Sequence, residues 1–170
     1  MKTLTISSIL ILLSASPLLA GQDVPSSRRS REAIRRASPA IRIRLAERGI
    51  EFGAPVYIRI FKEEMLLEVW LEGGDGFELF RSYPVCTCGT GGPGPKTRQG
   101  DGMAPEGFYF VTPSRMNPFS DFHLSFDLGY PNSYDRHHKR TGGALMVHGS
   151  CVSIGCYAMT DELMEEIFTL

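Results

Sequence analysis

Short stretches in which hydrophobic and polar residues alternate dominate the middle of the chain. Residues 56–61 and 65–71 are rich in β-branched and aromatic residues and flank a Lys62-Glu63 turn, which predicts a β-hairpin. The same pattern predicts further strands at 77–83, 108–112, 122–128 and 144–148. The chain is therefore expected to be mainly β, a sandwich or a barrel-like sheet.

Two short helices are expected to flank these strands. Ser38 can cap a helix that has Pro39 at its first position and stops at Gly49. Near the C-terminus, Thr160 can cap a helix that carries Leu163, Met164, Ile167 and Phe168 on one side.

Two long polar loops separate the later strands. Residues 86–107 are rich in Gly and Pro, and residues 129–143 are dense in His, Arg and Tyr. Loops of this length are unusual in a compact domain unless they have a function, so both are candidates for substrate binding.

The first 20 residues have the layout of a secretory signal peptide. Lys2 gives a positive start, an apolar run follows from Ile6 to Leu13, and cleavage is plausible after Ala20. The run is too short for a good membrane span, and an uncleaved anchor is the alternative. Residues 21–37 are expected to be a flexible Ser/Arg-rich lead segment and residues 38–170 the folded domain of a protein that works outside the cytoplasm.

Composition and cysteine content narrow the function classes. A chain of 170 residues, 42% of them hydrophobic, predicts one domain, and a net charge of -1 gives no basic excess for nucleic acid. We expect no cofactor, and the oligomeric state is left open. The spacings of Cys86, Cys88, Cys151 and Cys156 do not match the common zinc patterns, so no metal site is expected.

An even number of cysteines in an oxidising compartment suggests disulfides. A bridge between Cys86 and Cys88 would be strained, however, and any nucleophilic cysteine must stay reduced. Cys151 is open to three interpretations: a structural thiol, a partner of Cys86 or Cys88, or a redox brake on Cys156. A structural role is favoured.

The segment from Val147 to Met159 concentrates reactive side chains. A thiol becomes a good nucleophile only when it loses its proton, and an imidazole can accept that proton to form a thiolate–imidazolium pair. His148 ends a predicted strand and Cys156 follows eight residues later, after a Gly155 that permits a tight turn. A buried cysteine beside a core histidine is the alternative for such a pair taken alone.

The wider sequence resembles the L,D-transpeptidase catalytic-domain (YkuD-type) family. His148-Gly149 and Ser153-Ile154-Gly155-Cys156 resemble the two parts of its catalytic motif. Other fragments follow in the order seen in the YafK-like branch of that family: Gly100-Asp101-Gly102, Ala104-Pro105-Glu106-Gly107, Arg115-Met116-Asn117-Pro118 and Tyr130-Pro131-Asn132. The resemblance runs from about Pro55 to Met164.

The resemblance implies a role for each residue of the motif. Cys156 would be the nucleophile, His148 the base, and the carbonyl of Gly149 would orient the imidazole. Amides around Gly155 would bind the oxyanion. Substrate contacts are expected from Arg136, Asn132, Ser153 and Lys96.

The implied reaction begins with attack of Cys156 on a carbonyl of a diaminopimelate-containing peptidoglycan stem, which gives a thioester. An amine would then complete a transpeptidation, whereas water would complete a hydrolysis that releases a lipoprotein tethered to peptidoglycan. A catalytically silent cell-wall-binding module, with its site blocked by truncation or by a Cys151–Cys156 disulfide, is the alternative from another class.

Three features depart from the wider family. Ala158 stands where an arginine is frequent, and Ile154 where a histidine is common. The chain also ends at Leu170, earlier than members of the YafK-like branch generally do, which leaves open whether the catalytic domain, residues 38–170, is truncated. The resemblance also implies a periplasmic location for this domain.

Overall fold

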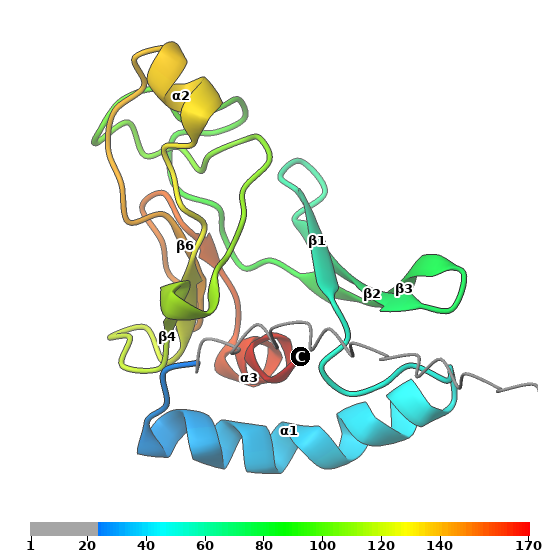
Figure 1. The fold of residues 1–170 in the computed structure, drawn as a ribbon. Helices are drawn as coiled ribbons and strands as arrows, with labels where there is room; N and C mark the ends of the chain where they lie inside the picture. The colour runs from blue at the N-terminus through cyan, green and yellow to red at the C-terminus, as the bar shows by residue number, and fades with distance from the viewer. Residues whose placement is uncertain (1–23) are drawn as a thin grey trace, which may run out of the picture.

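The computed structural model describes residues 24–170. The predicted signal peptide lies outside the described residues. Within them, three α-helices and seven strands follow one another along the chain (Figure 1). No helix of this part of the chain is long and apolar enough to cross a membrane.

The first sheet is a three-stranded antiparallel meander formed by β1 (Val56–Phe61), β2 (Leu66–Gly73) and β3 (Gly76–Pro84). In β2 buried and partly exposed residues alternate, with Leu67, Val69 and Leu71 directed into the core. Because this alternation is local, the sequence pattern predicted these strands correctly.

The second sheet has the order β4-β5-β6-β7 and consists of very short strands. They are β4 (Met116–Asn117), β5 (Ser125–Asp127), β6 (Met146–His148) and β7 (Tyr157–Ala158). The predicted strands at 122–128 and 144–148 are therefore shorter than expected. The strand predicted at 108–112 does not form, and its alternating Phe108 and Phe110 are exposed.

The N-terminal helix α1 (Arg28–Ala46) corrects the prediction for this region, because much of the expected flexible lead segment is helical. Ser27 caps the helix through a hydrogen bond from the amide of Ser30, and Pro39 lies inside the helix instead of at its start. Ala33, Ile41 and Leu45 are buried on one side of it. Burial of this side stabilises the helix in a segment whose Ser/Arg-rich composition suggested exposure to solvent.

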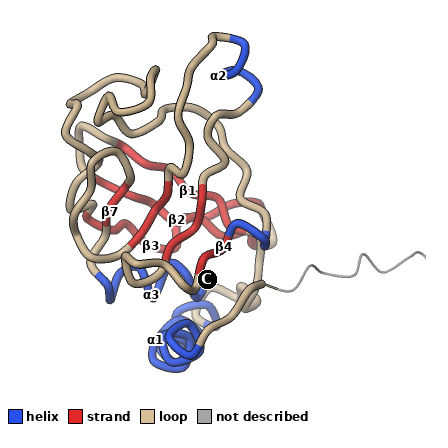
Figure 2. Tube along the Cα trace, turned by 90° about the vertical axis from the view of Figure 1, so that its left-hand side faces the viewer, coloured by secondary structure: helices blue, strands red, loops and turns tan. Residues whose placement is uncertain are grey.

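The C-terminal helix α3 (Asp161–Thr169) begins at the Thr160 cap, as predicted, and buries Met164, Ile167 and Phe168. It lies between α1 and the strands, whereas α2 (Ser133–His137) lies at the opposite end of the molecule (Figures 1 and 2). Arg36 and Arg44 of α1 pair with Glu165 and Glu166 of α3. Helix and strand take similar shares of the described residues, so a mainly β fold is only partly confirmed.

Candidate active site

The second sheet brings the residues of the predicted motif onto neighbouring strands. In β5 and β6, Ser125 pairs with His148 and Asp127 with Met146, so these four side chains share one face of the two strands. In the parallel pair β6–β7, His148 lies opposite Ala158. Cys156, just before β7, therefore reaches the same part of β6 that carries His148.

His148 is buried and held in one orientation. Its Nδ1 lies 2.6 Å from the carbonyl oxygen of Gly149, which can only accept a hydrogen bond, so Nδ1 carries the proton and Nε2 is the basic nitrogen. The ring of Phe122 lies against the imidazole, with centroids 4.7 Å apart. Burial lowers the pKa of His148, and the bond to Gly149 only partly opposes this effect.

The turn after His148 requires a glycine. The amide of Gly149 donates to the carbonyl oxygens of Phe122 and Leu124. A Cβ on this residue would lie 2.5 Å from Oδ1 of Asp161 and 2.9 Å from Cβ of His123. The same Asp161 oxygen accepts a hydrogen bond from the Ser150 amide at 2.7 Å, so the start of α3 fixes the turn.

A disulfide between Cys86 and Cys151 joins this turn to the start of the 86–107 loop. Of the three interpretations of Cys151, pairing with Cys86 is therefore confirmed, and Cys151 is not the free structural thiol that was favoured. Cys88 and Cys156 are free thiols, so the Cys151–Cys156 bridge that would have blocked the site is not formed.

The thiol of Cys156 contacts the backbone of the β6 segment. The Met146 amide donates to its Sγ at 3.4 Å, and the thiol donates to the Ala144 carbonyl at 3.7 Å. It makes no hydrogen bond to His148 in the described structure. Burial is the main reason why the pKa of this thiol is raised, so burial keeps both the thiol and the imidazole uncharged in the resting site.

Ser153 holds the backbone of the nucleophile. Its Oγ accepts hydrogen bonds from the amides of Gly155 and Cys156, at 3.0 and 2.6 Å, and donates to the Cys156 carbonyl at 2.8 Å. Ser153 therefore has an internal structural role, and the substrate contact expected from it stays a prediction. The Gly155 amide, expected to bind an oxyanion, is occupied by the same hydroxyl group.

The 86–107 loop folds against this turn. A Cβ on Gly89 would lie 2.9 Å from Cα of Gly155, which shows how closely the two backbones approach. Lys96, expected to contact substrate, is buried in this loop and donates to Oδ1 of Asp101 at 2.7 Å. Its ammonium group is therefore part of the loop's own framework.

The 129–143 loop contains α2, and Asn132 caps that helix. Its Oδ1 accepts from the Asp135 amide at 2.9 Å and its Nδ2 donates to the Phe108 carbonyl, so Asn132 also has an internal role. The substrate contact expected from Asn132 stays a prediction. The buried Asp135 pairs with Arg140, and not with its neighbour Arg136. The sequence carries the signal for this cap, because Asn132 and Asp135 have capping-box spacing.

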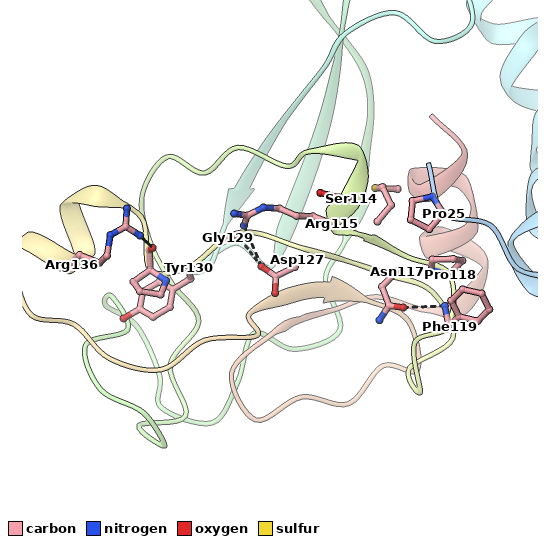
Figure 3. A pocket seen from close by; sticks show the side chains of 12 residues that line it. Pro25, Ser114, Arg115, Asn117, Pro118, Phe119, Asp127, Gly129, Tyr130 and Arg136 are labelled. Atoms are coloured by element: carbon pink, nitrogen blue, oxygen red, sulfur yellow. Dashed lines mark hydrogen bonds and ion pairs between the residues drawn. The ribbon is translucent and has the colours of Figure 1, made fainter. Parts of the chain in front are cut away.

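Arg136, one of the expected substrate contacts, lines a groove. The groove encloses about 720 Å³ and extends along β4, β5 and residues 129–131. Arg115 and Asp127 lie at its centre, and Arg136 lies at one end (Figure 3). Neither Arg115 nor Asp127 is among the site residues expected from the sequence. Among residues 24–170, no group of three or more His, Cys, Asp or Glu side chains is arranged to hold a metal ion.

Comparison with known proteins identifies the family of the chain. Residues 55–170 match the family model of the L,D-transpeptidase catalytic domain. Over 116 residues the chain is 50% identical to the Escherichia coli K12 protein named "Putative L,D-transpeptidase YafK". This match covers 68% of the chain and 47% of that protein, so the chain spans about half the length of the curated relatives it matches.

Solved structures resemble the fold. The helical cell shape determining protein Pgp2 from Campylobacter jejuni aligns with a TM-score of 0.53 and 24% identity, over 75% of this chain and 50% of that one. Bd1075 from Bdellovibrio bacteriovorus aligns with a TM-score of 0.51 and 26% identity, over 68% of this chain and 42% of that one. The match to the family model covers most of the chain, and the chain therefore belongs to the L,D-transpeptidase catalytic domain family.

Proposed function

We propose that this protein is a cysteine acyl-transfer enzyme that acts on diaminopimelate-containing stem peptides of peptidoglycan. One observation carries the proposal beyond family membership. Cys156 is a free thiol next to the strand that ends in His148, and the Gly149 carbonyl leaves Nε2 of that histidine as the basic nitrogen. A nucleophile and an oriented base are the two parts that such chemistry requires.

The reaction begins with two uncharged groups. Nε2 of His148 takes the proton of the Cys156 thiol as Sγ adds to the carbonyl carbon of the stem. The bond from that carbon to the leaving amine then breaks, and the imidazolium returns its proton to the amine. The product is a thioester on Cys156. An incoming amine or water then attacks the carbon of this thioester and loses a proton to His148. The carbon–sulfur bond breaks, and the imidazolium passes that proton to Sγ, which restores the thiol.

The acceptor decides between transpeptidation and hydrolysis. We favour hydrolysis that frees a lipoprotein tethered to peptidoglycan, because the sequence fragments resemble the YafK-like branch. The relative that is 50% identical over 116 residues is named "Putative L,D-transpeptidase YafK", so it supports the acyl-enzyme step that both reactions share. A silent wall-binding module is the weaker candidate, since Cys156 is not blocked by a disulfide.

A periplasmic location is part of the proposal. Disulfides persist in oxidising compartments, and the Cys86–Cys151 bridge fits such an environment. The apolar run at 6–13 is the candidate export signal.

Incubation with lipoprotein-bearing peptidoglycan, followed by mass spectrometry of the products, tests the proposal. Freed lipoprotein with intact stems would indicate hydrolysis, and new cross-links would indicate transfer. Cys156→Ala should give neither product, whereas Cys88→Ala, which removes the other free thiol, should retain activity. Absence of both products from the wild-type reaction would contradict an acyl-transfer function.

A further inference from the structure

The groove beside β5 has an arrangement of charge that the proposed reaction does not by itself explain. Arg115 and Asp127 face each other at its centre, with Nη1 and Oδ1 3.5 Å apart (Figure 3). Charge-assisted hydrogen bonds of this type are normally 2.7–2.9 Å long, so the pair is loose. Both side chains are partly exposed, at 38% and 31%.

Contacts with Gly129 hold both Arg115 and Asp127 in place. The Gly129 amide donates to Oδ1 of Asp127 at 2.6 Å, which fixes the carboxylate. Gly129 has φ +84°, and any Cβ on it would overlap the guanidinium of Arg115. The glycine therefore lets the guanidinium lie against the backbone, so that both charged groups are fixed in place before a ligand arrives.

The groove has an excess of positive charge. Arg136 lies at one end, where its guanidinium donates to the Pro131 carbonyl, and it has no carboxylate partner among the described residues. Two guanidinium groups and one carboxylate therefore line the groove. Such a site suits a ligand that carries an ammonium group and a larger number of carboxylates.

The groove also adjoins the nucleophile. Asp127 pairs with Met146 across the β5–β6 ladder, and the Met146 amide donates to Sγ of Cys156 at 3.4 Å. After burial, the negative charge of Asp127 is among the causes that raise the pKa of Cys156. A substrate residue whose carbonyl carbon lies beside Sγ of Cys156 can therefore place its side chain in the groove.

We propose that the groove binds the free amino acid centre of diaminopimelate, with its carboxylate on Arg115 and its ammonium group on Asp127. Diaminopimelate has two such centres, and when one is in amide linkage the other keeps both charges. On binding, the loose ion pair between Arg115 and Asp127 would be replaced by two ion pairs with the ligand, one to each residue. This inference rests on the proposed function, because the diaminopimelate whose side chain binds in the groove is the same stem residue whose carbonyl Cys156 attacks.

Calorimetric titration of the full chain carrying Cys156→Ala tests this site without turnover. The probes are the tripeptide L-Ala-γ-D-Glu-diaminopimelate and the same peptide amidated only at the carboxylate of the diaminopimelate centre that keeps its free amino group. The free peptide should bind about tenfold or more tightly than the amidated one. Arg115→Gln should remove this difference in affinity, and Asp127→Asn should weaken the binding of both probes. Arg35→Gln, on the exposed side of α1, is the control and should leave the binding of both probes unchanged.

Equal binding of the two probes, no binding of either, or an unchanged preference in Arg115→Gln would overturn the inference. If Arg115→Gln does not fold, Arg115→Lys keeps the charge but loses the bidentate fork, and it should reduce the preference. The proposed function is measured separately. If the wild-type protein shows no turnover but Cys156→Ala prefers the free peptide, the proposed reaction is refuted and the binding site is supported. If the wild-type protein turns over but Cys156→Ala binds both peptides equally, only the binding site is refuted.

Discussion

Nδ1 of His148 lies 2.6 Å from the carbonyl oxygen of Gly149, the next residue in the chain. This bond fixes the tautomer of a buried imidazole at the end of β6, while the turn that supplies the carbonyl is held by Asp161 and by the Cys86–Cys151 disulfide. The geometry of the base therefore depends on helix α3 and on the 86–107 loop, and each of these contacts can be tested.

The first prediction concerns pH. Burial raises the pKa of Cys156 and lowers that of His148, so the resting pair is uncharged near neutral pH. In the Cys88→Ala protein, iodoacetamide labelling of Cys156 should increase with pH, with a midpoint above that of an ordinary cysteine. Because the base form of His148 persists below the usual histidine pKa, the acid limb of kcat/KM should be displaced to lower pH. Labelling already complete at neutral pH would instead indicate a thiolate–imidazolium pair.

The second prediction concerns Gly149. In Gly149→Ala the new methyl group meets Asp161 and His123, so the turn must shift. We expect a loss of about 1–3 kcal/mol in unfolding free energy, measured by urea denaturation, and a lower turnover rate. Gly74→Ala is the matched control, since a Cβ there meets no atom within 4 Å. Equal stability of the two variants would refute the packing argument.

The third prediction concerns Ser153. Ser153→Ala leaves the amides of Gly155 and Cys156 without their hydroxyl partner, which should cost about 1–3 kcal/mol of stability. The thiol should also be less well positioned, so turnover should fall. Ser150→Ala provides the comparison, because that side chain makes no hydrogen bond within the described residues. Thermal melts and rates that match those of Ser150→Ala would show that Ser153 does not hold the turn.

The fourth prediction concerns the disulfide, which joins residues 65 positions apart. The chain-entropy model gives about 4 kcal/mol for a loop of this length, so Cys151→Ser should lower the unfolding free energy by roughly that amount. Cys88→Ser should have a much smaller effect. Dithiothreitol should bring the wild-type protein to the stability of Cys151→Ser, and a wild-type protein insensitive to the reductant would contradict the assignment.

The sequence predicted those parts of the fold that local patterns determine. The alternation in β2 and the Thr160 cap of α3 are local signals, and both were read correctly. Helix α1 was placed too late because its N-terminal half is rich in Ser and Arg. Burial of Ala33 and Ile41 within the fold, together with the Arg36–Glu165 pair, stabilises this helix, and neither can be read from a local window.

The site was predictable where a motif carries the chemistry. His148 and Cys156 were predicted from their motif, and the structure places His148 at the end of β6 and Cys156 just before the neighbouring strand β7. Polar residues were harder to assign, because a side chain that caps a turn, such as Asn132 or Ser153, has the same residue types as one that binds substrate. Arg115 and Asp127 were missed because they come together only when the short strands β4 and β5 pair.

Detection of the acyl-enzyme tests the central claim most directly. The protein is mixed with a diaminopimelate-containing stem peptide, quenched in acid and digested, and the Cys156 peptide is examined by mass spectrometry. We predict a mass increase equal to the acyl part of the stem on Cys156, removed by hydroxylamine and absent from Cys156→Ala. Turnover that persists in Cys156→Ala, or an adduct on another residue, would contradict the account.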